Sequence, residues 1–312
     1  MRSTGSSMAE RAPPPDPRAP DPRAVRRAFG RAAATYDTAA ALQREVGGRL
    51  AERLDVVKLV PRTVLDAGCG TGAALGELAA RYPDARLVAL DAAAPMVGAA
   101  RERWRRSRSL FARLVGPLAR GGATPAFVCG DVTALPLGNA SVELAWSNLV
   151  LQWVDDPRRA FDELRRVLAV GGLLTFTTFG PDTLKELARA FAAVDGHTHV
   201  SRFVDMHDLG DMLVHAGFAD PVMDMEMLTV TYATPAALLA DLKALGATNQ
   251  TRGRPRGLTG KSRRRALDDA LAALARDGRI PATFEVVYGH AWKGEPRKTA
   301  EGLPIVKVQK RR

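Results

Sequence analysis

The sequence predicts an α/β protein with a mostly parallel sheet flanked by helices, and three observations support this fold class. Short apolar runs that end in polar or small residues recur between residues 63 and 179. Stretches with helical periodicity separate these runs, which is the pattern of βαβ units. A glycine-rich turn, "DAGCGTG" at 66–72, stands at the end of the first run. Such a turn is typical of the place where a strand is followed by a helix.

The beginning of the chain changes character near residue 24. Residues 1–23 are rich in Pro, Ala and charge and contain no aromatic residue, so we expect them to be disordered. Residues 24–58 are expected to form one or two amphipathic helices, with Phe29, Tyr36 and Leu42 on the apolar side.

The rest of the chain is expected to supply seven strands and the helices between them. A core of residues 60–180 should hold strands at 63–68, 86–91, 126–131, 142–148 and 173–179. Its helices should lie near 72–81, 95–106 and 157–169. A second block, 181–283, should hold a strand near 222–232 and helices near 181–193, 205–216, 235–245 and 262–276. Residues 284–292 should be the strand that closes the sheet, and a basic tail, 294–312, follows.

The composition is ordinary for a globular chain, but the charge is not. Of 312 residues, 46% are hydrophobic and 25% are charged, and the net charge is +11. No apolar run reaches the roughly 18 residues of a membrane span, and the start lacks a signal peptide, so we expect a cytoplasmic protein. The positive charge suggests an acidic partner. Cys69 and Cys129 give neither a disulfide framework nor a metal-ligand spacing.

The glycine-rich turn is a candidate ligand-binding loop. Gly68, Gly70 and Gly72 would let a ligand approach the backbone next to the free N–H groups of a helix start. Their spacing is GxGxG, not the GxGxxG of dinucleotide-binding proteins, and a purely structural turn remains the alternative. The next strands end in Asp91 and Asp131, and ligands of open α/β sheets bind at these carboxyl ends.

This series of strand ends resembles the S-adenosylmethionine-dependent methyltransferases of the Rossmann-like class. The resemblance implies a class I methyltransferase fold, residues 24–293, with a helical N-terminal lid and a substrate-capping region. It implies Asp66, Gly68 and Gly70 around the methionine part of the cofactor, Asp91 on the ribose, and Asp131 with Val132 on the adenine. Further cofactor contacts are expected from Gln43, Gly72, Met96 and Asn148.

The sequence lacks the features of enzymes that methylate nucleic-acid bases. The fourth strand continues into "SNLVLQW" and not into an N/D-P-P-Y/F stretch, and Cys129 follows Val128, not a proline. Aromatic residues make up only 6% of the chain, so the positive charge alone does not indicate nucleic acid. We expect neither nucleic acid nor a membrane as partner.

A closer resemblance rests on segments outside the glycine loop, above all "FGRAAATYDTAAALQ" (29–43), "FTTFGPDTLKEL" (176–187), "HVSRF" (199–203) and "DLKALGATN" (241–249). They resemble the malonyl-acyl-carrier-protein O-methyltransferases of biotin synthesis, and the resemblance covers roughly residues 25–292. It implies methylation of the free carboxyl of malonyl on acyl carrier protein, with malonyl-coenzyme A possible. The alternative is an S-adenosylmethionine-binding arginine hydroxylase of respiratory complex assembly, which shares much of the pattern.

The histidine-rich stretch "HTHVSRFVDMHDLGDML" (197–213) raises the question of a metal site. Its spacing matches no metal motif, so no metal is expected, and 205–216 fits an amphipathic helix capped by Asp205. Arg202 could grip the malonyl carboxylate or could form a structural ion pair. His199 is a candidate substrate contact. Tyr36 could place its hydroxyl near the transferred methyl group or could be a buried core tyrosine. No general base is expected, because a carboxylate is already ionised when it accepts a methyl group.

Two internal segments carry much of the positive charge, 101–120 and 252–265. Such runs are commonly solvated faces. Acyl carrier proteins are acidic, so a basic surface would also steer and orient them, and we expect 252–265 to be the docking surface. The segment 101–120 departs from the family pattern and has no predicted role.

Overall fold

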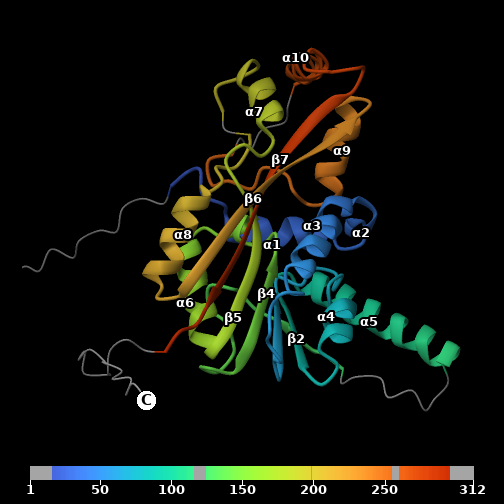
Figure 1. The fold of residues 1–312 in the computed structure, drawn as a ribbon. Helices are drawn as coiled ribbons and strands as arrows, with labels where there is room; N and C mark the ends of the chain where they lie inside the picture. Colours follow the sequence, from blue (N-terminus) through green and yellow to red (C-terminus); the bar gives the residue numbers. More distant parts are fainter. Residues whose placement is uncertain (1–15, 116–123, 198, 255–259, 296–312) are drawn as a thin grey trace, which may run out of the picture.

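In the computed structural model, which describes residues 16–115, 124–197, 199–254 and 260–295, one sheet forms the centre of the protein (Figure 1). Among these residues it has seven strands in the order β3-β2-β1-β4-β5-β7-β6. The pairs among β1 to β5 are parallel, whereas β7 is antiparallel to both β5 and β6. The bounds are β1 (Thr63–Ala67), β2 (Arg86–Asp91), β3 (Ala126–Cys129), β4 (Val142–Asn148), β5 (Leu168–Phe179), β6 (Ala219–Tyr232) and β7 (Ile280–Trp292). The predicted fold class is confirmed.

Helices cover both faces of this sheet. One face carries α3 (Ala41–Glu52), α4 (Leu75–Arg81) and α5 (Ala94–Val115), and the other carries α6 (Pro157–Val167) and α8 (Met206–His215). Neighbouring residues of β1, Val64 and Leu65, are both fully buried and belong to different apolar clusters. A strand buried on both faces is apolar throughout, which explains the apolar runs without alternation in the sequence.

The N-terminal part forms α1 (Pro22–Ala32), α2 (Tyr36–Ala39) and α3, so the helical stretch is divided into three and not into one or two. Asp21 caps α1, accepting hydrogen bonds from the backbone N–H groups of Arg23 and Ala24. The expected disorder of residues 1–23 is wrong at its end, because residues 16–23 are ordered. Asp21 N donates to Gln250 O at 2.8 Å, and Pro20 forms a β-bridge with Thr251.

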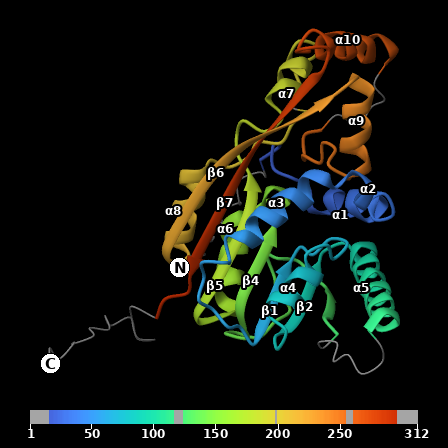
Figure 2. The ribbon, with the colours of Figure 1, turned by 45° about the vertical axis from the view of Figure 1, so that its right-hand side comes forward.

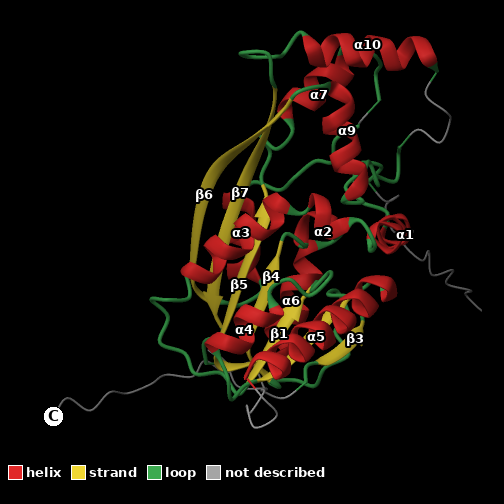
Figure 3. Cartoon of the chain, turned by 90° about the vertical axis from the view of Figure 1, so that its right-hand side faces the viewer, coloured by secondary structure: helices red, strands yellow, loops and turns green. Residues whose placement is uncertain are grey.

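Part of the second block, without α8 and the first half of β6, forms a cap beyond the core (Figures 2 and 3). Residues 280–285 of β7 continue past the end of β5, where they pair only with β6. Around this extension lie α7 (Lys185–Ala192), α9 (Pro235–Ala244) and α10 (Lys261–Ala272). The lid helices α1 to α3 lie between the core and this cap, so that each can contribute walls to the space between them (Figure 3).

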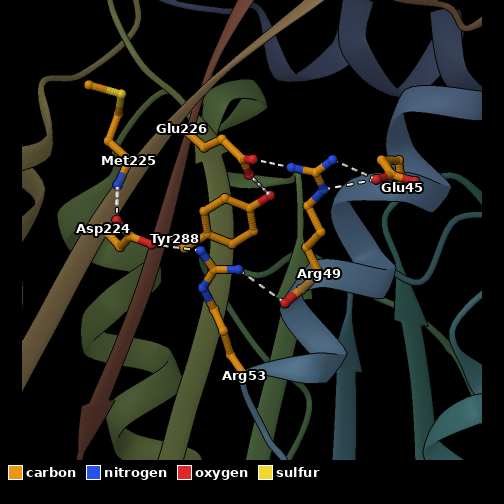
Figure 4. Close-up of polar contacts among 7 residues, drawn as sticks. All are labelled: Glu45, Arg49, Arg53, Asp224, Met225, Glu226 and Tyr288. Carbon is orange, nitrogen blue, oxygen red and sulfur yellow. Dashed lines mark hydrogen bonds and ion pairs between the residues drawn. The ribbon is translucent and has the colours of Figure 1, made fainter.

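A cluster of charged side chains fastens α3 to the outer strands (Figure 4). Arg49 pairs with Glu226 of β6 and with Glu45 on its own helix. Arg53 binds Asp224 at 2.6 Å, and its guanidinium lies 3.6 Å from the ring centroid of Tyr288 in β7. These contacts join the lid to the strands that carry the cap.

Candidate functional site

The glycine-rich loop has the backbone conformation that its residues predict. Gly68, Gly70 and Gly72 have φ angles of +85°, +51° and +76°, a region that favours glycine. A Cβ atom at Gly68 would lie 2.2 Å from a side-chain carbon of Val150, and one at Gly72 would lie 2.9 Å from Leu75. A Cβ at Gly70 would meet nothing within 4 Å. Packing therefore requires glycine at the two outer positions, whereas Gly70 faces open space.

That open space belongs to a cavity of about 870 Å³, here called the core pocket, between the strand ends and the lid. Its roof comes from α1 through Pro22, Val25 and Phe29. Its floor and walls bring together seven of the residues expected to contact the cofactor, namely Gly68, Gly70, Asp91, Met96, Asp131, Val132 and Asn148. Three others do not line it: Gln43, Asp66 and Gly72.

The two acidic residues below the loop differ in their hydrogen bonds. Asp91 accepts from the backbone N–H groups of Gly70 at 3.0 Å and Ala93 at 2.8 Å. Asp66 is only 3% exposed, and its Oδ2 has no hydrogen-bond partner in the described chain. Burial, with a smaller contribution from the charge of Asp91, raises the pKa of Asp66 to about 7. The site therefore holds a buried acceptor that can be neutral or charged near neutral pH.

Cys69 lies between these glycines and is not a candidate nucleophile. Its side chain is buried, and burial together with the neighbouring Asp66 and Asp91 raises the pKa of its thiol. The thiol therefore stays protonated at neutral pH, where only the thiolate would react.

A second cavity of about 1340 Å³, the cap chamber, lies between the lid and the cap. Its lining is mostly apolar and comes from α2, α3, α7, α9, the 199–203 segment and the turn after β4. None of the described lining residues is a lysine or an arginine. The carboxylate among these described lining residues, Asp241, accepts a hydrogen bond from the Tyr232 hydroxyl at 2.6 Å.

The core pocket and the cap chamber share four lining residues: Phe29, Tyr36, Leu149 and Trp153. Phe29 packs edge-on against Trp153, with ring centroids 5.2 Å apart, and lies 6.3 Å from the Tyr36 ring. Burial, followed by the charges of Asp91 and Asp37, raises the pKa of Tyr36. Its hydroxyl thus remains a hydrogen-bond donor at the wall where the two cavities meet.

Tyr36 is held there by its neighbour in the sequence. Asp37 accepts from the Thr71 hydroxyl at 2.6 Å and pairs with Arg103 of α5 at 3.0 Å. Thr71 belongs to the glycine-rich loop, so this pair of contacts fastens α2 to the core. The pattern of the sequence did not indicate this latch, because its three residues come from segments with no common motif.

The histidine-rich stretch is divided by the structure. His199 lines the cap chamber, lies 2.8 Å from Asp195 through its Nε2 atom, and stacks on Phe191 at 3.8 Å between ring centroids. Arg202 is exposed and lines neither cavity, so the structure does not bring it to the place expected for a carboxylate ligand. The predicted helix cap is confirmed, since Asp205 accepts from the His207 backbone N–H at 2.8 Å.

The fold is that of the class I S-adenosylmethionine-dependent methyltransferases, and comparisons with known proteins agree. The methyltransferase domain family matches residues 65–176. A solved structure of a putative methyltransferase from Bacillus halodurans is similar, with a TM-score of 0.55 and 17% identity over 79% of this chain and 99% of that one. At this identity the likeness concerns the fold alone.

Two curated relatives define the family more closely, and both are named malonyl-[acyl-carrier protein] O-methyltransferase. The relative from Laribacter hongkongensis is 51% identical over 92% of this chain and 95% of its own length. The one from Nitrosospira multiformis is 52% identical over 89% of this chain and 91% of its own length. The chain therefore belongs to the family of malonyl-[acyl-carrier protein] O-methyltransferases. In the described part of the chain, no helix is both long and apolar enough to span a membrane.

Proposed function

We propose that this protein transfers the methyl group of S-adenosylmethionine to the free carboxyl of malonyl carried on acyl carrier protein. The observation that carries the proposal is the junction of two cavities at Tyr36, one beneath the glycine-rich loop and one, largely apolar, under the cap. Family membership supports the same reaction. Arginine hydroxylation is not favoured, because these relatives carry the methyltransferase name.

The core pocket suits the cofactor. Gly70 leaves room for a ligand against the backbone. Asp66 does not line the pocket, but its Oδ2 is buried and unpartnered, and it would provide an acceptor for the ammonium group of the methionine part. Asp91 would accept from the ribose hydroxyls, and Asp131 and Val132 would contact the adenine. Met96 and Asn148 would complete the walls. Bound there, S-adenosylmethionine supplies a methyl group activated by its positively charged sulfur.

The chain's own residues then align the reactants and exclude water. A malonyl carboxylate is already ionised at neutral pH, so no residue has to remove a proton. Phe29, Tyr36 and Trp153 pack together and line both cavities, so the methyl group and the carboxylate would meet beside them. The Tyr36 hydroxyl would donate a hydrogen bond to the carboxylate there, holding it in line for attack. His199, which also lines the chamber, would contact the acyl thioester.

The carrier protein would dock on the first turns of α10. Lys261, Arg263, Arg264 and Arg265 are all exposed there. Arg263 also lies 3.7 Å from Asp195, the residue that holds His199 in the chamber wall. The expected docking segment 252–265 also includes 255–259, which lie outside the described residues. An acidic carrier bound at this end of α10 could pass its prosthetic arm into the cap chamber, whereas malonyl-coenzyme A would reach the chamber without this contact.

The decisive experiment is turnover of malonyl-carrier protein by the purified full chain with S-adenosylmethionine, read by mass spectrometry of the acyl group. The expected product is the malonyl methyl ester, formed in equal amount with S-adenosylhomocysteine. If the protein binds S-adenosylmethionine with ordinary affinity and yields no methyl ester, the proposal fails. A hydroxylated arginine in a protein substrate would then favour the alternative.

A further inference from the structure

Gln43 occupies the wall between the two cavities because of a hydrogen bond to its main chain. Asn148, which lines the core pocket, donates from its Nδ2 to the carbonyl oxygen of Gln43 at 2.9 Å. The Asn148 amide is oriented by Thr177, whose hydroxyl donates to the Asn148 Oδ1 at 2.7 Å. The side chain of Gln43, in contrast, lines the cap chamber. The residue therefore faces the acceptor side of the wall and not the cofactor side where the sequence suggested it.

The side-chain amide of Gln43 has an unused hydrogen-bonding atom that a ligand could occupy. Its Oε1 is buried and has no hydrogen-bond partner among the described residues. The other glutamine of the chamber, Gln152, differs, since its amide donates to Leu149 O at 2.8 Å and accepts from the Thr178 hydroxyl at 3.2 Å. A buried amide oxygen without a partner costs stability, so a ligand that completes the hydrogen bonds of this amide is the simplest reason for it.

The chamber also restricts how an acidic acceptor can be held. Its described lining contains no lysine or arginine, and its own carboxylate, Asp241, is engaged by Tyr232. The imidazole of this lining, His199, is engaged by Asp195 at 2.8 Å. A substrate carboxylate in this space therefore takes its hydrogen bonds from amide, hydroxyl or indole donors. At the wall facing the core pocket, the amide of Gln43, the hydroxyl of Tyr36 and the indole N–H of Trp153 are able to donate. Of these three side chains, Gln43 is the one with a buried polar atom that lacks a partner in the described part of the chain.

We propose that Gln43 and Tyr36 form an uncharged cradle for the reacting carboxylate, and that Gln43 is the residue that selects acceptors with a free carboxyl. This inference rests on the proposed function and deepens it. It names the residues that bind the carboxylate of the acceptor, and it excludes an arginine in that role. The unpartnered atom is the amide oxygen, and a flip of the amide would exchange it for the NH₂ group that donates to the carboxylate.

An uncharged cradle suits this reaction better than a cation. A carboxylate oxygen forms a bond to the methyl carbon, the bond from that carbon to sulfur breaks, and its electron pair stays on sulfur. One negative and one positive charge disappear, and no proton moves. A guanidinium beside the carboxylate would stabilise the charged reactant more than the transition state, in which that charge is already fading. Neutral donors in an apolar chamber hold the carboxylate while leaving it reactive.

The first test replaces Gln43 by Met, which keeps the length of the side chain and removes its hydrogen bonds. We expect kcat/KM with malonyl-carrier protein to fall by about ten- to a hundred-fold, the range for a lost hydrogen bond to a charged group. Affinity for S-adenosylmethionine, measured by calorimetry, should stay within about twofold, because Gln43 does not line the core pocket. The melting temperature should hold or rise, since the variant removes a buried amide oxygen that lacks a hydrogen bond.

Gln152→Met is the matched control in the same chamber. It makes the same chemical change where the amide is bonded within the protein, so we expect a lower melting temperature. The selective readout is binding of malonyl-carrier protein compared with acetyl-carrier protein, in the presence of S-adenosylhomocysteine. Wild type and Gln152→Met should prefer the malonyl form, whereas Gln43→Met should lose most of that preference.

A second variant tests the absence of charge. Gln43→Arg should lower both KM and kcat for malonyl-carrier protein. The added cation would bind the carboxylate more tightly and would lower its reactivity as a nucleophile. An increased kcat in this variant would overturn the inference. So would a Gln43→Met variant that keeps its preference for malonyl while losing cofactor affinity. A wild-type protein that binds S-adenosylmethionine but methylates no malonyl-carrier protein would overturn the proposed function, and this inference with it.

Discussion

At the scale of single residues, Asp66 shows how a functional group can destabilise the protein that carries it. The carboxyl is fully enclosed at the end of β1, and one of its oxygens lacks a partner. Burial raises its pKa from 3.8 to about 7. The folded protein thus binds a proton more tightly than the unfolded chain, so that stability falls as pH rises from about 4 to about 7.

The resulting prediction concerns Asp66→Asn in the cofactor-free protein. The amide cannot ionise, so the variant should gain melting temperature relative to wild type at pH 8 and gain much less at pH 5. The affinity of the wild type for S-adenosylmethionine should change with pH in the direction opposite to its stability. Wild type should bind better as pH rises through about 7, because the carboxylate form then becomes available to an ammonium group, and the variant should bind weakly throughout. A melting-temperature difference that is the same at both pH values would contradict the assigned pKa.

Some of the site residues expected from the sequence line the cavities, and others do not. Residues at strand ends, such as Asp91 and Asp131, line the core pocket because a parallel sheet brings the carboxyl ends of its strands to one edge. Arg202 lies in a segment without regular structure between α7 and α8, where no periodicity indicates which way a side chain points. Sequence alone gave no means of placing it, and it lies exposed, outside both cavities.

At the scale of the elements, the strands and helices were predictable, but several ends were not. β5 begins at Leu168 and not near residue 173, because it runs on through Gly171 and Gly172, where the register with β4 shifts. β7 begins at Ile280, since its first residues need only β6 as a partner. The division of the lid at Thr35 and Ala40 carried no proline or glycine to mark it. Tertiary contacts, not local propensity, fix these ends.

The latch at Asp37 leads to a prediction for the lid as an element. Asp37→Ala removes the contacts of α2 with Thr71 and Arg103. The lid should then open more often, and the dissociation rate of S-adenosylmethionine should rise by about three- to tenfold. This effect is smaller than for a buried pair, because solvent weakens the contacts of the half-exposed Asp37 carboxylate. Stopped-flow measurement of cofactor release checks this. The matched control is Thr38→Ala, on the same helix, whose hydroxyl donates to the backbone of the lid itself, at Thr35 O. Equal rates in both variants would mean that the latch does not control the lid.

At the scale of the whole molecule, the positive charge is spread over surfaces at opposite ends. The basic start of α10 lies in the cap, beside the walls of the cap chamber, whereas the basic part of α5 projects from the core (Figure 1). The net charge of +11 alone would attract an acidic carrier to either surface. Only the first surface could deliver a malonyl group to the chamber, so position and not total charge should decide productive docking.

The prediction is a comparison of two charge reversals of equal size. Changing Arg263, Arg264 and Arg265 to Glu should raise the KM for malonyl-carrier protein strongly, and the effect should shrink as salt rises, since exposed charges are screened over about 10 Å at 0.1 M. Changing Arg101, Arg105 and Arg106 on α5 alters the net charge equally and should raise this KM far less. Both triple variants should keep their activity on malonyl-coenzyme A, which has no carrier surface to dock. If the two reversals weaken the carrier reaction equally, general attraction is sufficient and α10 is not a docking surface. If the α10 reversal lowers activity on both substrates, its arginines act on the chamber through Asp195, which pairs with Arg263, and not on the carrier.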